Sequence, residues 1–339
     1  MVNAISFINA GVSRANSSDK STVRSAEALD RKIKQYSEKL MKFIGTNGSF
    51  EIIPAFVFAI DRNLPMKDIY KWFEQHNIKI QTDKIHISDV YLTLIALTFA
   101  SLPNKAYEGV GIYVYSSKDD SDAEYCGESD SMGINAKCQR RYNLFNDNDQ
   151  SDSPALVVNF ESVKDFSNLV LHELAHRWQR FYDCREFYDI SWRRLHVSNE
   201  MIGGQYWPYT NGQEWDFAVQ YKDQRHNRSE DLSTVIGEMY TDTRSLIMRA
   251  VENLYGRSDR DLADKVFYCY RLYGNANDPD NWIVRSKPNG YIYRSGGETW
   301  ALEIGQEGPT KRRISDRIDP NAFINASISI SPMEPRPTK

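Results

Sequence analysis

Two histidines and one glutamate stand at a spacing that suits metal chemistry. His172 and His176 lie four residues apart, with Glu173 directly after the first histidine, in the segment His-Glu-Leu-Ala-His. On an α-helix, residues four apart share one face, so both imidazoles could bind the same metal ion. Glu173 would then face the open side of the ion and take a proton from a metal-bound water. The pattern predicts a zinc-dependent hydrolase that binds one Zn²⁺ per chain, with Glu173 as its general base.

The flanking sequence predicts the strand and the helix that must position this motif. Residues 153–160 are mostly apolar and partly β-branched, which predicts a strand. Between Phe166 and Trp178 an apolar residue recurs at every fourth position, which predicts a helix through the motif, with Ser162 near its start as the N-cap. A strand that leads into a helix is the context that this motif requires.

A catalytic zinc site requires a third protein ligand besides the two histidines. The extended motif that supplies a third histidine is absent, because Gln179 and Tyr182 occupy its glycine and histidine positions. A glutamate on a later helix is the alternative source of this ligand. The candidates are Glu200, Glu230, Glu238 and Glu298.

A helix is expected between Ser229 and Tyr255, and it carries two of these candidates. Its apolar residues recur at helical spacing, and the phase of that face alone slightly favours Glu238 over Glu230. Glu238 also begins a Glu-Met-Tyr-Thr-Asp segment that resembles the ligand helix of thermolysin-like enzymes, in which the aspartate orients a histidine ligand. Spacing therefore leaves the choice between Glu230 and Glu238 open.

A second resemblance favours Glu230. The segment from Phe217 to Tyr221 and the Glu-Asp-Leu-Ser run that starts at Glu230 are together similar to a pattern in lethal-factor-like zinc metallopeptidases and their bacterial relatives. In these gluzincin-type enzymes a tyrosine in an extended segment precedes the helix of the glutamate ligand. The resemblance covers about residues 155–255. It implies that Glu230 is the third zinc ligand and that Tyr221 is the catalytic tyrosine.

The expected reaction is the hydrolysis of peptide bonds in a peptide or protein substrate. Zinc would polarise the scissile carbonyl, Glu173 would carry the proton, and Tyr221 would donate a hydrogen bond to the oxyanion. Asp231 or Asp242 could orient a histidine ligand. A peptidase of this kind could be a secreted bacterial effector or a toxin-like protease.

Two other functions stay open at this point. A non-catalytic protein could keep the zincin scaffold and bind a partner through the aromatic segment 183–228. A zinc hydrolase could instead act on peptidoglycan peptides. The residue pattern does not separate these substrates.

The elements together predict an α+β fold of the zincin type. A twisted sheet that includes residues 110–115 and 155–160 would back the helix of the motif, and the helix from Ser229 would lie on the other side of the metal. A short last helix is expected at 295–305. Four regions follow: a disordered leader at 1–25, a mainly helical accessory region at 26–105, the catalytic domain at 106–305 and a tail at 306–339.

Composition argues against several other classes of protein. The chain of 339 residues is 41% hydrophobic and 26% charged, with a formal net charge of −4, so we expect a soluble globular protein without a nucleic-acid partner. No apolar stretch approaches the length of a membrane span, and the N-terminus does not resemble a Sec-type signal peptide. These features leave a cytoplasmic location and export by a specialised secretion system open. Cys126 and Cys138 could form a disulfide in an oxidising compartment.

Overall fold

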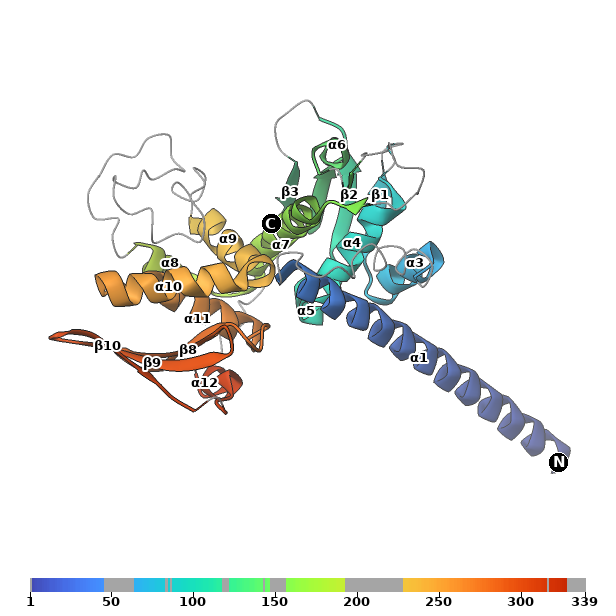
Figure 1. Ribbon diagram of the computed structural model, residues 1–339. Coiled ribbons are helices and arrows are strands. Elements are labelled where there is room, and N and C mark those ends of the chain that lie inside the picture. Colours follow the sequence, from blue (N-terminus) through green and yellow to red (C-terminus); the bar gives the residue numbers. More distant parts are fainter. Residues whose placement is uncertain are drawn as a thin grey trace.

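Figure 1 shows the computed structural model, which combines helices with three separate sheets. The structure describes residues 2–45, 64–82, 85, 87–117, 122–142, 144–146, 157–192, 228–315 and 317–327. This mixture of helix and sheet confirms the α+β class in its coarse form.

A four-stranded sheet lies beside the helix that carries the two histidines. Its strands, in spatial order, are β1 (Lys79–Thr82), β2 (Gly111–Tyr115), β4 (Ser131–Asn135) and β3 (Ala123–Cys126). The first three are parallel, and β3 pairs with β4 in the antiparallel direction at one edge. Ile112, Val114, Met132 and Ile134 of the two central strands are buried in the main core. The strand expected at 110–115 is therefore confirmed.

The expectation that residues 155–160 join this sheet is wrong. Of this range the structure describes 157–160, where β6 (Val157–Val158) pairs with β5 (Phe145–Asn146) in a small separate sheet. The strand ends early because the next helix, α7 (Phe160–Phe181), begins at once. The side chain of Asn159 caps α7 by accepting a hydrogen bond from the backbone N–H of Ser162, so Asn159 is the N-cap in place of Ser162.

The N-terminal helices pack against the same core. They are α1 (Val2–Gly45), α3 (Met66–Gln75), α4 (Asp89–Ala100), α5 (Asn104–Tyr107) and the short α6 (Cys138–Arg141), which follows β4. The first helix of the region 26–105 belongs to α1, which also runs through the segment 1–25 and projects from the molecule (Figure 1). The region 26–105 also contributes β1 to the sheet. It therefore shares its sheet and its core with the residues that follow.

Five helices form the centre of the molecule. After α7 come α8 (Arg185–Trp192), α9 (Arg228–Thr241), α10 (Thr243–Arg257) and α11 (Asp261–Tyr273). The single helix expected from Ser229 to Tyr255 is thus two helices. They are separated by Asp242, whose backbone angles of φ −147° and ψ 45° lie outside the helical range.

A second sheet completes the C-terminal part. It is an antiparallel meander of β7 (Trp282–Lys287), β8 (Gly290–Ser295), β9 (Glu298–Gly305) and β10 (Gly308–Arg313), followed by α12 (Pro320–Asn325). The short helix expected at 295–305 is wrong. Gly296 and Gly297 both have positive φ, which suits the two-residue turn of a β-hairpin. Both β10 and α12 fall within the segment 306–339 that was expected to be a tail.

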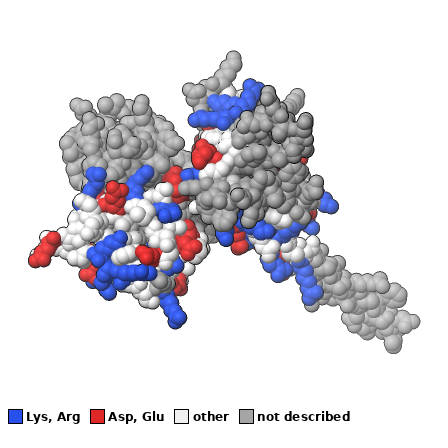
Figure 2. Space-filling model, in the orientation of Figure 1, with Lys and Arg blue, Asp and Glu red and all other residues white. Residues whose placement is uncertain are grey.

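The helix pair α7 and α9 lies between the two four-stranded sheets, with α10 and α11 next to the C-terminal sheet (Figure 1). On the face shown in Figure 2, Lys and Arg are interspersed with Asp and Glu over the described surface. The four cysteines are free, including Cys126 and Cys138. No helix in the described ranges is long and apolar enough to cross a membrane.

Candidate metal centre

Arg177, the residue after His176, anchors α7 to the first sheet. Its buried guanidinium donates two hydrogen bonds to Asp130, of 2.8 and 2.9 Å, in the turn between β3 and β4. It also donates to the backbone carbonyls of Ala106 (3.0 Å) and Glu108 (2.8 Å). A forked cation with this many acceptors fixes both the position and the rotation of the helix. The motif is thereby held in one orientation.

On its other side, α7 packs antiparallel to α9, and polar residues face each other across the contact. These residues recur at every fourth position on both segments, in the pairs Lys164–Asp242, Asn168–Glu238, His172–Thr234 and His176–Glu230. The pairing brings the two histidines of α7 to the first turn of α9. It also brings Lys164 and Asn168 to the end of α9.

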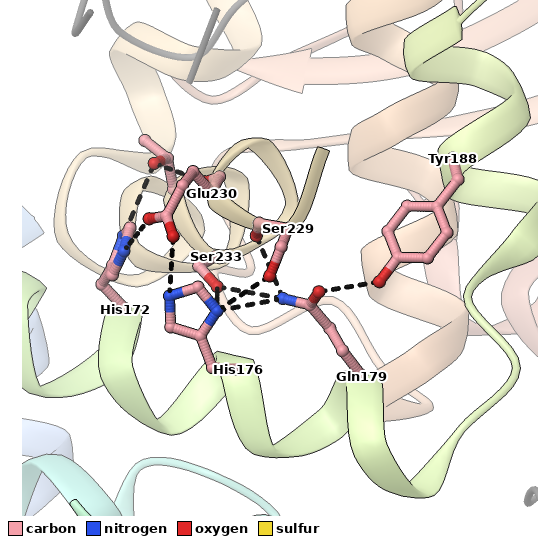
Figure 3. Close-up of polar contacts among 8 residues, drawn as sticks. His172, His176, Gln179, Tyr188, Ser229, Glu230 and Ser233 are labelled. Atoms are coloured by element: carbon pink, nitrogen blue, oxygen red, sulfur yellow. Dashed lines mark hydrogen bonds and ion pairs between the residues drawn. The ribbon is translucent and has the colours of Figure 1, made fainter. Parts of the chain in front are cut away.

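His172, His176 and Glu230 form one cluster, as predicted (Figure 3). One ligand atom from each lies within 4.8 Å of the others. The Nε2 atoms of His172 and His176 lie 2.9 and 3.5 Å from the two carboxylate oxygens of Glu230. Both imidazoles therefore present the same ring nitrogen to the same carboxylate.

The other candidate glutamates do not reach this cluster. Glu238 accepts a hydrogen bond of 2.9 Å from the amide of Asn168, one turn of α7 before His172. Glu298 lies on β9 and pairs with Arg313. Glu200 lies outside the described residues. Among the residues that the structure describes, Glu230 is the glutamate that meets both histidines.

The charges in the cluster stabilise one another. Burial by itself raises the pKa of the Glu230 carboxyl, but hydrogen bonds from His172 and His176 outweigh it and hold this pKa well below its usual range. Burial likewise lowers the pKa of His176, but the adjacent carboxylates of Glu230 and Glu173 outweigh this effect, and the net shift is upward. The arrangement thus favours a positive charge between the imidazoles and the Glu230 carboxylate.

Glu173 lies on α7 between the two histidines and is buried. Burial raises the pKa of its carboxyl, and the charge of Glu230 adds to the rise, while the two imidazoles oppose it. Glu173 is not one of the clustered ligands. A carboxyl beside the ligands and outside their set is the placement that the sequence predicts for a general base.

Hydroxyl groups face the outer nitrogen of each imidazole. The Nδ1 atom of His172 lies 3.5 Å from the Thr234 hydroxyl, and that of His176 lies 3.0 and 3.2 Å from the hydroxyls of Ser229 and Ser233. A carboxylate from Asp231 or Asp242 was the expected partner. The i, i+3 and i, i+4 spacing of Ser233 and Thr234 from Glu230 is a signal that could have indicated the hydroxyls.

The two aspartates have other partners in the structure. Asp231 forms a fully buried ion pair of 2.8 Å with Lys265 of α11, and Asp242 pairs with Lys164 at 3.0 Å. Both aspartates therefore pair with lysines and join helices together. Tyr221 lies outside the described residues, as do residues 193–227 of the aromatic segment 183–228.

Comparisons of the chain with protein-family models, with curated proteins and with solved structures give no match. The functional argument therefore depends on the residues of this chain.

Proposed function

We propose that this protein is a zinc-dependent peptidase whose metal is held by His172, His176 and Glu230. The observation that carries the proposal is the convergence of two imidazole nitrogens and one carboxylate within 4.8 Å. Two histidines and a glutamate are a common ligand set of catalytic zinc, which leaves a fourth position for water. Imidazole also suits zinc better than it suits magnesium or calcium.

The orientation of the ligands supports a metal at this point. Both histidines direct Nε2 toward Glu230, while their Nδ1 atoms face hydroxyl groups. A neutral imidazole that binds a metal through Nε2 carries its proton on Nδ1 and donates it to a neighbouring acceptor. Thr234, Ser229 and Ser233 supply such acceptors. The negative charge of Glu230 offsets part of the charge of a divalent cation.

In such a site, zinc would lower the pKa of its bound water to about 7 and polarise the scissile carbonyl. Glu173 takes the proton of the attacking water and delivers it to the leaving amine. Tyr221 remains the predicted donor to the oxyanion, on the resemblance of its segment. The presence of a carboxyl beside the ligands favours a hydrolase over a scaffold that only binds a partner.

The proposal is tested by metal content and by one isosteric substitution. We expect the purified protein to hold one zinc per chain, which a chelator removes. Glu173→Gln should keep the zinc and lower the rate of cleavage of denatured casein by about 10²–10⁴-fold, since general acid–base catalysis contributes this much. Glu161→Gln, on an exposed position of the same helix, is the matched control and should leave both unchanged. A protein without transition metal after expression with zinc supplied would contradict the metal site, and full activity of Glu173→Gln would exclude it as the base.

A further inference from the structure

Gln179 lies where three helices meet. It is on α7, three residues after His176, and its amide nitrogen lies 3.0 Å from the backbone carbonyl of Ser229 and 3.2 Å from the hydroxyl of Ser233, both on α9. Its amide oxygen accepts a hydrogen bond of 2.7 Å from the hydroxyl of Tyr188 on α8. Figure 3 shows the side chain between the tyrosine and the ligand cluster.

The contacts fix which end of the amide faces the metal ligands. A backbone carbonyl cannot donate a hydrogen bond, so the group that faces the carbonyl of Ser229 must be the nitrogen of Gln179. The oxygen then faces Tyr188, whose hydroxyl can donate. Gln179 is thereby a donor toward α9 and an acceptor toward α8. Its two ends are not interchangeable.

The two contacts on α9 lie on both sides of a metal ligand. Ser229 precedes Glu230 and Ser233 follows it by three residues, so Gln179 holds the turn of helix that carries this carboxylate. The same two serines provide the hydroxyls at 3.0 and 3.2 Å from Nδ1 of His176, and the amide nitrogen of Gln179 itself lies 3.4 Å from this Nδ1. One side chain therefore restrains the surroundings of two of the three clustered ligands.

We propose that Gln179 is the positioning residue of this site, and that its amide ties Glu230 and the Nδ1 side of His176 to Tyr188 of α8. The inference rests on the proposed function, because it concerns the affinity of the cluster for zinc. Gln179 does not touch the reacting atoms. It holds the ligand side chains in their binding positions in the metal-free protein. It also keeps the serine hydroxyls in place as acceptors for the Nδ1 proton of His176.

The test measures zinc affinity on the full chain, by competition with a chelator of known affinity. Gln179→Met keeps the length of the side chain and removes both ends of the amide. It should lower zinc affinity by about 10–100-fold, the typical cost of losing a group that orients a metal ligand. Tyr188→Phe removes only the hydroxyl and should lower the affinity in the same direction by a smaller factor. Tyr182→Phe is the matched control, because its ring packs against Trp178 instead, and it should bind zinc like the unmodified protein.

A spectroscopic measurement separates positioning from general damage to the fold. In the zinc-loaded protein, the Nδ1 proton of His176 should give a protected NMR signal, and this signal should be lost or should exchange faster in Gln179→Met. Unchanged affinity and an unchanged signal in Gln179→Met and Tyr188→Phe would overturn the inference. If Gln179→Met does not fold, the zinc affinity and the Nδ1 signal of Tyr188→Phe decide whether the inference holds. An unmodified protein that binds no zinc would instead defeat the proposed function itself.

Discussion

Glu230 and Glu238 are the same residue type on the same helix, yet their carboxyl groups have opposite electrostatic surroundings. Both project from α9 toward α7. Glu230 meets two imidazoles, which hold its pKa well below the usual range. Glu238 meets the amide of Asn168, and its burial, together with the charge of Asp242, raises its pKa to about 7. At Glu230 the imidazoles of the facing helix outweigh burial, whereas at Glu238 burial outweighs the hydrogen bond from Asn168.

The width of the gap between the helices contributes to this difference. A Cβ atom at Gly237 would lie 2.7 Å from the amide oxygen of Asn168, so glycine allows the side chain of Asn168 to pack directly on the backbone of α9. The hydrogen bond from Asn168 covers part of Glu238, which is half-buried. At the other end, Ser229 and Ser233 place their hydroxyls beside Nδ1 of His176. The end at Asn168 and Gly237 is thus the closed end of the pair, and the other end carries the three clustered ligand atoms.

The largest expected effect concerns zinc binding. Glu230→Ala removes a direct ligand and should weaken zinc binding by more than about 100-fold, because even a group that only orients a ligand costs about 10–100-fold. Glu238→Ala removes a carboxyl that contacts Asn168 instead and should change the affinity by only a small factor. Competition with a chelator measures both variants. The opposite ranking would move the third ligand to Glu238 and restore the thermolysin-like interpretation of this helix.

A second, intermediate effect concerns the pH dependence of folding. In the unfolded chain Glu238 ionises near its ordinary pKa of 4.5, and in the folded protein at about 7. Below pH 4.5 the carboxyl is protonated in both states and has no effect. Between 4.5 and 7 only the unfolded chain loses the proton, so stability falls as pH rises, and above 7 the loss is complete.

Glu238→Gln should remove this loss, because glutamine keeps the acceptor for Asn168 and carries no charge. The variant should match the unmodified protein near pH 4.5 and exceed its free energy of unfolding at pH 8 by up to roughly 3 kcal/mol. Urea unfolding of both proteins across this pH range, with chelator present so that metal occupancy is constant, provides the measurement. A constant difference between the two proteins at all pH values would mean that Glu238 titrates near its ordinary pKa.

Local spacing alone places His172 and His176 on one face of α7, since residues four apart on a regular helix share a face, and the structure brings both to one carboxylate. The phase of the apolar residues favours Glu238 over Glu230 as the third ligand. It is a poor guide here, because α9 packs on several sides and a residue near the edge of its apolar face is buried whether or not it meets the histidines. Only the antiparallel pairing of α7 with α9, which joins segments far apart in sequence, places Glu230 at the histidines. The serine hydroxyls depend on the same pairing.

The errors in the fold have similar causes. Residues 155–160 have strand composition, but the cap at Asn159 starts α7 before a long strand can form. Residues 295–305 were assigned to a helix, although two consecutive glycines with positive φ turn the chain into a hairpin. In both places a local signal of one or two residues outweighs the average preference of the segment.

The smallest expected effect is on the pKa of Glu238 itself. It tests how much the neighbouring charges at the closed end of the helix pair contribute to this pKa besides burial. Lys164 lies between two carboxyls: it pairs with Asp242 at 3.0 Å and also lowers the pKa of Glu238, while Asp242 raises it. Lys164→Met should therefore raise the pKa of Glu238, and Asp242→Asn should lower it, each by less than about one unit because both groups are partly exposed. An NMR titration of the Glu238 carboxyl carbon measures both shifts. Shifts in opposite directions would show that the charge pair adjusts a pKa set mainly by burial. No shift in either variant would mean that burial alone raises the pKa of Glu238.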